Sequence, residues 1–226
     1  MAARIIPFLG FMAFIGIEEL LDFLRQQGVL AFADSSLMWL YPVKVAVTAL
    51  LLAFFYRQYQ ELSWRDLARW RDTLLSLVLG LVVFVLWINM EWSLPFAGGE
   101  GRNLFNPGLI EASGTRFFLV GSRLAGAVLV VPLMEELFWR SFLLRYLQGD
   151  NFLQIEIGRF TWFSCLATVV LFGLEHHLFY AGLMAGLFYN LLLYRTKSIA
   201  QCTLAHAVTN LALGLYVLAS HNWSFW

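Results

Sequence analysis

Three short groups of polar side chains interrupt stretches of the chain that are otherwise apolar. In chain order, the groups are Glu135-Glu136 with Arg140, His176-His177, and His206 with Asn210. An ionisable side chain at the centre of a bilayer costs roughly 2.5–3.5 kcal/mol on insertion scales, so such residues usually belong to a functional site. Carboxylates, imidazoles and an amide are also the side chains from which a hydrolytic centre can be built.

The first group places its two carboxylates in different surroundings if the segment is helical. Glu136 and Arg140 are four residues apart, which puts them on one helix face where they can form an ion pair. Glu135 points about 100° away and lacks that partner. A carboxylate without a partner in a dry site suits general-base work, whereas the paired one would support the structure. Pro132 should loosen the helix just before the two acids. A solvated charged face at the membrane edge is the alternative.

The second and third groups supply imidazoles and an amide. Phe172 precedes His176 by four residues, so its ring can separate that imidazole from lipid. His206 and Asn210 are also four apart and can point two neutral donors at one place, as an oxyanion requires. A satisfied core histidine and helix–helix hydrogen bonding are the alternatives for these segments. Since a polar patch on each of three helices is costly unless the patches meet, we expect them to converge on one cavity.

The segments that must position these side chains have the composition of membrane helices. Of 226 residues, 60% are hydrophobic and 13% are charged, against about 25% charged in a typical soluble domain. The apolar runs predict an all-α, polytopic membrane bundle of about seven helices in one domain, 1–226, with the motif-bearing core at about 117–220. The predicted helices are 5–24, 37–56, 74–94, 117–133 (continuing to about 147), 160–180, 181–194 and 199–220.

Polar links between these runs predict how the chain is oriented. The links are 57–72, 95–116 and 148–158, and the first is either an amphipathic segment on the membrane surface or an ordinary basic loop. Most Arg and Lys residues fall on the same side as 57–72, which predicts a cytoplasmic N-terminus and a C-terminus outside. Acidic residues, rather than a small-residue cleavage site, follow the first apolar run, so we expect that helix to be retained.

Other residues in apolar surroundings have structural interpretations. Cys165 and Cys202 are expected to be small buried apolar side chains. Gly182 is followed four residues later by Gly186, a spacing that lets a neighbouring helix approach closely. The near-membrane charges Glu18, Glu19, Lys44 and Glu91 could line a polar path. Placement at the membrane interface is favoured for the three acids, with Lys44 reaching towards it.

The groups follow the patterns E-E-x-x-x-R, F-x-x-x-H and H-x-x-x-N in that order along the chain. In this the chain resembles the CPBP family, the CAAX-protease and bacteriocin-processing membrane peptidases (the Abi group), and in particular the bacterial CAAX-protease-related proteins associated with exosortase systems. The resemblance implies a glutamate-type intramembrane endopeptidase with no metal or cofactor, in a bacterial inner (plasma) membrane. Its catalytic residues would be Glu135, His176, His206 and Asn210, supported by Glu136, Arg140, Phe172 and His177, and His177 is the alternative to His176 as the active histidine.

The implied reaction is hydrolysis of a peptide bond near the membrane by a water that Glu135 and His176 activate. The expected partners are the lipid bilayer and a peptide or protein substrate, a class that includes lipidated and membrane-anchored proteins. The 15 basic and 15 acidic residues cancel, so no nucleic-acid partner is expected.

Two other functions compete with this interpretation. A zinc metalloprotease is less favoured because the chain contains no H-E-x-x-H helix. A non-catalytic membrane scaffold, an immunity factor or a small transporter that retains the polar cavity is the alternative from another class. Transporters tend to show inverted repeats, and none is recognised in this sequence.

Overall fold

The computed structural model describes residues 1–90 and 105–226, and every regular element in those ranges is helical. The α-helices are α1 (Ala2–Gln26), α2 (Asp34–Leu37), α3 (Leu40–Phe54), α4 (Trp70–Trp87), α5 (Ser113–Ala125), α6 (Val131–Glu136), α7 (Leu144–Tyr146), α8 (Trp162–Glu175), α9 (Phe179–Thr196) and α10 (Ile199–Ser220). Two π-helical stretches join α5, α6 and α7 into one long helix. The prediction of an all-α membrane bundle is confirmed.

Four helical segments are long and apolar enough to cross a membrane, judged by length and composition: Ser35–Phe54, Trp70–Trp87, Ser113–Tyr146 and Ile199–Ser220. The protein is therefore an integral membrane protein. The predicted ends of the last helix agree with α10, whereas the predicted helix 160–180 was too long, because α8 already ends at Glu175. The end of the predicted helix 74–94 and the first part of the link 95–116, residues 95–104, lie outside the described residues.

The link between α3 and α4 does not form a continuous amphipathic helix. It contains two short 3₁₀ turns, Tyr56–Gln58 and Trp64–Ala68, and α4 begins at Trp70, inside the predicted link. Three more 3₁₀ turns occupy Pro107–Leu109, Phe152–Gln154 and Trp223–Phe225. Whether this segment lies on the membrane surface stays a prediction.

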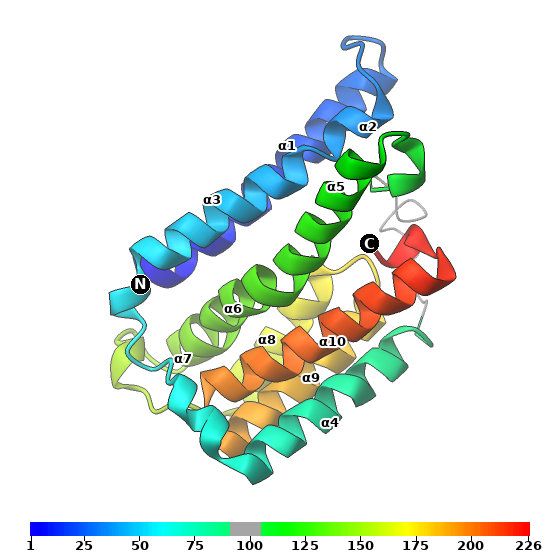
Figure 1. The fold of residues 1–226 in the computed structure, drawn as a ribbon. Coiled ribbons are helices and arrows are strands. Elements are labelled where there is room, and N and C mark those ends of the chain that lie inside the picture. The colour runs from blue at the N-terminus through cyan, green and yellow to red at the C-terminus, as the bar shows by residue number, and fades with distance from the viewer. Residues whose placement is uncertain (91–104) are drawn as a thin grey trace.

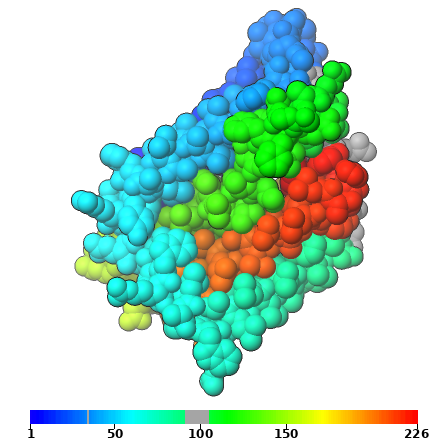
Figure 2. All heavy atoms as spheres, in the orientation of Figure 1, coloured from blue at the N-terminus to red at the C-terminus, as the bar shows by residue number. Residues whose placement is uncertain are grey.

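The pairs α1–α3 and α8–α9 are antiparallel, whereas α4 and α10 run in the same direction, because Ser76, Gly80 and Phe84 contact Gln201, Thr209 and Tyr216 in that order (Figure 1). Figure 1 shows α1 and α3 side by side along one edge, with the α5–α7 helix next to them and α10 and α4 beyond it. Across the face shown in Figure 2, α3, α5, α10 and α4 follow one another in that order. The shorter helices α8 and α9 form a hairpin behind α10.

Glycines allow two helix pairs to approach closely. A Cβ atom at Gly80 of α4 would lie 2.4 Å from the carbonyl oxygen of Ala205 in α10, so only glycine fits there. In the hairpin, a Cβ at Gly182 would lie 3.0 Å from the Cα of Gly173, and one at Gly186 would lie 3.3 Å from the Phe172 side chain. The predicted packing role of Gly182 and Gly186 is confirmed.

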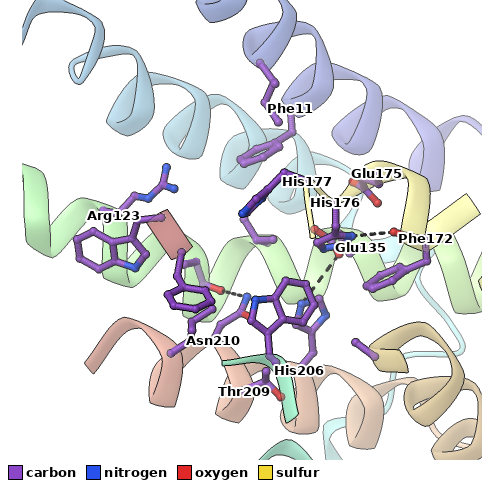
Figure 3. A pocket seen from close by; sticks show the side chains of 18 of the residues that line it. Phe11, Arg123, Glu135, Phe172, Glu175, His176, His177, His206, Thr209 and Asn210 are labelled. Atoms are coloured by element: carbon purple, nitrogen blue, oxygen red, sulfur yellow. Dashed lines mark hydrogen bonds and ion pairs between the residues drawn. The ribbon is translucent and has the colours of Figure 1, made fainter. Parts of the chain in front are cut away.

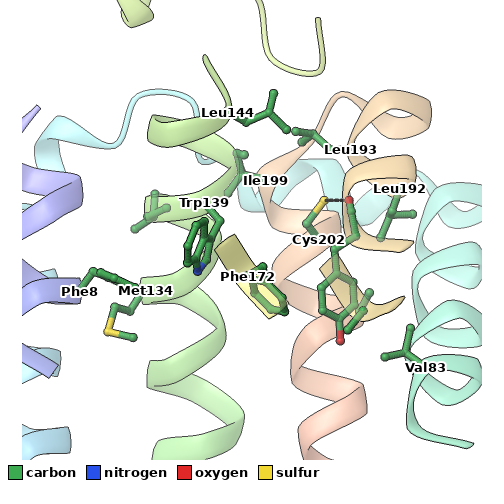
Figure 4. Close-up of a cluster of buried hydrophobic side chains, with 14 of the residues drawn as sticks. Phe8, Val83, Met134, Trp139, Leu144, Phe172, Leu192, Leu193, Ile199 and Cys202 are labelled. Carbon is green, nitrogen blue, oxygen red and sulfur yellow. Dashed lines mark hydrogen bonds between the residues drawn. The ribbon is translucent and has the colours of Figure 1, made fainter. Parts of the chain in front are cut away.

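Apolar side chains from α1, α6, α8, α9 and α10 surround the middle of the bundle (Figure 4). Phe8 stacks on Phe138 with ring centroids 3.8 Å apart, and Trp139 meets the Phe172 ring edge-on at 5.7 Å. Both cysteines are free and buried within the bundle, as expected. This packing encloses the polar groups of the chain in largely apolar surroundings.

The long α5–α7 helix changes its winding on both sides of the two acids. The stretches Gly126–Val130 and Leu137–Leu143 are π-helical and flank α6. Pro132 lies at the start of α6 and has no N–H to bond the carbonyl four residues earlier, in agreement with the expected loosening. Such π-helical turns often occur at functional sites.

Candidate active site

A cavity of about 380 Å³ lies between α1, α3, the α5–α6 segment, α10 and the turn that joins α8 to α9. The lining includes six residues that the sequence singled out: Glu135, Phe172, His176, His177, His206 and Asn210. Figure 3 shows Glu135, His176 and His206, from three different segments, next to one another in the cavity. The three polar groups therefore do converge, while Glu136 and Arg140 lie behind the cavity wall.

Glu136 is fully buried and joins two of the polar groups. Its Oε1 atom accepts a hydrogen bond from Arg140 Nη1 at 3.1 Å, which confirms the predicted ion pair. The same oxygen lies 3.0 Å from His206 Nδ1. Because a carboxylate only accepts, His206 Nδ1 carries the proton in this contact if Glu136 is ionised. Glu136 thereby fixes the orientation of the His206 ring.

Arg140 is a buried cation whose donors are satisfied from several sides. Besides Glu136, it donates to Asn190 Oδ1 at 3.3 Å and to the carbonyl oxygen of Gly186 at 3.2 Å, both in α9. Its guanidinium carbon lies 4.5 Å from the centroid of the Phe172 ring. These contacts attach the acid-bearing helix to the α8–α9 hairpin, which carries the histidine pair.

Glu135 has no such partners. Its side chain is buried, and within the described part of the chain the Oε2 atom has no hydrogen-bond partner. The nearest basic atom recorded for it is His206 Nε2, at 4.0 Å. The two adjacent acids therefore differ as expected: Glu136 is held by Arg140 and His206, and Glu135 faces the cavity.

His176 lies where α8 ends, and this break brings it level with Glu135. Its backbone is extended (φ −101°, ψ 137°), and its Nδ1 atom is 2.7 Å from the carbonyl oxygen of Phe172. Because the carbonyl can only accept, Nδ1 is the donor and the neutral ring has its lone pair on Nε2. The rings of Phe172 and Trp87 pack against the imidazole, with centroids 4.6 and 5.3 Å away.

The neighbouring histidine has different surroundings. The side chain of His177 is exposed, whereas that of His176 is partly buried between the two aromatic rings. Both line the cavity. Of the two candidates, His176 is the one with a ring fixed by a hydrogen bond and by packing.

The third group is arranged differently from a simple pair of convergent donors. His206 already directs Nδ1 at Glu136, and its ring stacks on Tyr189 with centroids 5.0 Å apart. Asn210 donates through Nδ2 to the carbonyl oxygen of Ala127, 2.8 Å away, in the first π-helical stretch. His206 Nε2 and the second N–H of the Asn210 amide are left for the cavity.

The cavity also contains charged residues that the sequence analysis did not assign to it. Glu175 lines it, and its Oε2 accepts a hydrogen bond of 3.0 Å from Trp139 Nε1. Its position directly before the histidine pair, inside an apolar run, was the signal that could have revealed it. Arg123 of α5 also lines the cavity.

The prediction that Lys44 reaches the membrane interface was wrong. Lys44 is only 4% exposed, lines the cavity and forms an ion pair of 2.8 Å with Glu18. The rings of Phe11 and Tyr41 lie 5.1 and 5.0 Å from its ammonium nitrogen. Since α1 supplies a carboxylate beside it, Lys44 is paired within the bundle. Glu91 lies outside the described residues.

The arrangement can be compared with metal sites and with known proteins. Within residues 1–90 and 105–226, no three His, Cys, Asp or Glu side chains are grouped so as to hold a metal ion. Residues 117–212 match the family model described as type II CAAX prenyl endopeptidase Rce1-like. No curated protein and no solved structure matches the chain. The matched segment contains all three polar groups.

Proposed function

We propose that this chain, which over residues 117–212 belongs to the CAAX-protease (CPBP) family, is a glutamate-type membrane endopeptidase that works without a metal ion. The observation that carries the proposal is the buried Oε2 of Glu135, which has no hydrogen-bond partner among the residues that the structure describes and lies 4.0 Å from His206 Nε2. A buried carboxylate without a partner is costly to the fold, so its retention calls for a reason other than stability.

The first step is activation of a water between Glu135 and His176. Because the Phe172 carbonyl fixes the His176 tautomer, Nε2 of His176 can accept a hydrogen bond from that water and orient it. Glu135 takes the proton as the water oxygen attacks the carbonyl carbon of a peptide bond. When the tetrahedral intermediate collapses and the C–N bond breaks, Glu135 returns the proton to the departing nitrogen. A positioned base of this kind typically contributes about 10²–10⁴-fold to the rate.

The negative charge that develops on the carbonyl oxygen is stabilised from α10. The second N–H of Asn210 is free to donate, since its other N–H is held by Ala127. His206 can donate through Nε2 only when that nitrogen carries a proton, and the contact of its Nδ1 with Glu136 fixes the direction in which Nε2 points. Glu136 is thus a positioning residue that acts through His206, and Arg140 holds Glu136 in place.

The proposed activity can be tested before the substrate is identified. Purified protein in lipid vesicles is incubated with a pool of synthetic free and lipid-tethered peptides, and new peptide termini are identified by mass spectrometry. We expect wild-type protein to generate new termini that Glu135→Gln does not, and 1,10-phenanthroline to leave their yield unchanged. Equal cleavage by Glu135→Gln would refute the assigned base. A chelator-sensitive reaction would refute metal independence.

Absence of any cleavage by wild-type protein would instead favour the non-catalytic alternative. A pulldown from membranes with Glu135→Gln as a trapping variant then provides a second readout, because a catalytic site should retain uncleaved substrate. Lipidated and unlipidated candidates can be compared in the same experiment.

We propose that the end of the bundle that carries Arg4 and Arg145 faces the cytoplasm of a bacterial inner membrane. Both arginines contact Glu61, in the loop between α3 and α4, so three separate segments gather at this end. The positive-inside rule then gives the expected orientation, with the C-terminus outside. Fluorescent-protein and phosphatase fusions to each terminus test it, and an active phosphatase at the N-terminus would contradict it.

A further inference from the structure

The far end of the same cavity carries a cation that the proposed chemistry does not use. Arg123, Ala127, Val131 and Glu135 all line the cavity, and they follow one another at intervals of four residues along the α5–α6 segment. Residues at this spacing lie on one face of a helix. The cavity therefore runs along that face, with Arg123 at one end and Glu135 at the other.

The spacing of these residues gives an approximate length for the cavity. At the α-helical rise of about 1.5 Å per residue, the twelve steps from Arg123 to Glu135 span at most roughly 18 Å along the helix axis, because the π-helical stretch Gly126–Val130 between them rises less per residue. An extended peptide advances about 3.3 Å per residue, so roughly five of its residues would cover this distance. In Figure 3, Arg123 and Glu135 are separated along this helix in the same way.

Arg123 is held in place but is not neutralised. Its guanidinium carbon lies 4.3 Å from the centroid of the Tyr41 ring and 5.3 Å from that of Phe105, and Tyr41 donates to its carbonyl oxygen at 3.2 Å. Within the described residues, no carboxylate oxygen is recorded within 4.0 Å of its nitrogens. The other cation at this end, Lys44, is already paired with Glu18.

The two ends of the cavity therefore differ in charge. Glu135 and Glu175 lie at the proposed catalytic end. At the other end the Lys44–Glu18 pair cancels, which leaves Arg123 as the charge without a counter-ion among residues 1–90 and 105–226. A carboxylate on a bound peptide would be attracted to the second end. In these largely apolar surroundings the preference is stronger than it would be in water.

We propose that Arg123 forms an anion-binding subsite that binds a carboxylate of the peptide substrate about four to six residues from the cleaved bond. The carboxylate is either the C-terminal group of the peptide or the side chain of an acidic residue. A guanidinium can bind both oxygens of such a group through parallel hydrogen bonds. The subsite sets the position of the peptide relative to Glu135, and in this respect the inference rests on the proposed function.

Binding is tested separately from cleavage. Glu135→Gln protein in immobilised nanodiscs is exposed to a pool of ten-residue apolar peptides, each made as a C-terminal acid and as an amide, with either one Glu or one Gln. If the C-terminal group binds, peptides with a C-terminal acid should be retained at least about 10-fold more than the matching amides. If the side chain binds, the peptides with Glu should be retained at least about 10-fold more than those with Gln. This preference should disappear in the double variant Glu135→Gln/Arg123→Met. It should persist in the double variant Glu135→Gln/Arg123→Lys, which keeps a positive charge at the position.

Controls separate loss of the subsite from loss of the fold. Arg159→Met, which removes an exposed arginine next to the link 148–158, should leave the preference intact. The thermal unfolding midpoint of each variant shows whether it is folded. Equal retention of all four peptide forms would overturn the proposal, as would a carboxylate preference that survives Arg123→Met. An Arg123 that only contacts lipid phosphate would give the first of these results.

Cleavage by protein that retains Glu135 then locates the subsite along the peptide. We expect the cleaved bonds to lie about four to six residues from the preferred carboxylate, and this spacing to be lost in Arg123→Met. If the retention preference depends on Arg123 but wild-type protein cleaves nothing, the subsite stands and the proposed endopeptidase function falls. If cleavage depends on Glu135 but shows no dependence on Arg123, the subsite falls and the function stands.

Discussion

The bundle buries two clusters of arginine and glutamate, and they differ in how fully their carboxylates are bonded. At one end, Arg4 bonds both oxygens of Glu61, at 2.7 and 2.6 Å, and Ser141 also donates to that carboxylate. In the cavity cluster, Oε1 of Glu136 contacts both Arg140 and His206, whereas Oε2 of Glu136 and Oε2 of Glu135 have no hydrogen-bond partner in residues 1–90 and 105–226.

This difference indicates that the cluster at Arg4 and Glu61 stabilises the fold, whereas the cavity cluster serves the proposed reaction. Arg145 completes the end cluster by donating to Ser141 Oγ at 3.0 Å, so the groups that meet there are bonded to one another. The same fold leaves Glu135 unbonded beside a cavity, although an unsatisfied buried polar group costs about 1–3 kcal/mol or more. We therefore expect changes in the end cluster to affect stability, and changes at Glu135 to affect activity.

The largest expected effect is on activity at Glu135. Glu135→Ala should lower the rate of peptide cleavage by about 10²–10⁴-fold, because it removes the proposed base. The unfolding midpoint should stay the same or rise, since the variant also removes a carboxylate that lacks a partner. Cleavage rates and thermal unfolding of the same preparations check both statements. A large loss of stability would show that Glu135 is structural after all.

The adjacent acid should behave in the opposite way. Glu136→Ala leaves Arg140 and His206 without their carboxylate and should cost about 3–5 kcal/mol of unfolding free energy, along with the activity. Glu136→Gln keeps the shape and one acceptor, so it should be intermediate. Comparison with Glu135→Gln gives a matched pair on neighbouring positions. Equal destabilisation of the two glutamine variants would remove the distinction between the acids.

A smaller effect is expected at Asn210, whose amide donates both to the helix and, in the proposed reaction, to the oxyanion. Loss of one oxyanion donor typically lowers the rate by about 10²–10³-fold. Asn210→Ala should therefore remain folded and retain slow turnover, unlike Glu135→Ala. Asn89→Ala is a suitable control, because the amide of Asn89 also donates to a backbone carbonyl, at 2.7 Å, but on the exposed surface. Unchanged turnover in Asn210→Ala would argue against its role.

Local spacing along helices predicted the parts of this site that depend on one helix alone. The Glu136–Arg140 ion pair follows from a separation of four residues, and so does the packing of Phe172 against His176. Apolar composition likewise predicted the bundle and the ends of α10, because a bilayer requires long apolar helices.

Contacts between distant segments were beyond the sequence argument. The bond from His206 to Glu136 joins residues 70 positions apart, and no local pattern marks it. The end of the predicted helix 160–180 was placed about five residues too late, because apolar residues resume directly after the histidine pair. The turn there is held by the side chain of His176, which bonds the carbonyl oxygen of Phe172. Lys44 was misplaced for a related reason: its partner, Glu18, lies on another helix.

The smallest expected effect is the pH dependence that the end cluster contributes. Burial alone would raise the pKa of Glu61, but its hydrogen bonds from Arg4 and Ser141 outweigh that and hold the pKa below its usual value. A carboxyl group with a lowered folded-state pKa stabilises the fold above its unfolded pKa, about 4.3, and loses this contribution as the pH falls through the folded pKa. The thermal unfolding midpoint of the wild type should therefore decrease once the pH is lowered below about 4.3. Glu61→Gln should lack the part of this decrease that Glu61 causes, and it should be less stable than the wild type at pH 7. Glu156→Gln, on the exposed link 148–158, is the matched control and should follow the wild type. If wild-type protein and Glu61→Gln lost the same amount of stability on acidification, the hydrogen bonds to Glu61 would not stabilise the fold. The proposed difference between the Arg4–Glu61 cluster and the cavity would then be wrong.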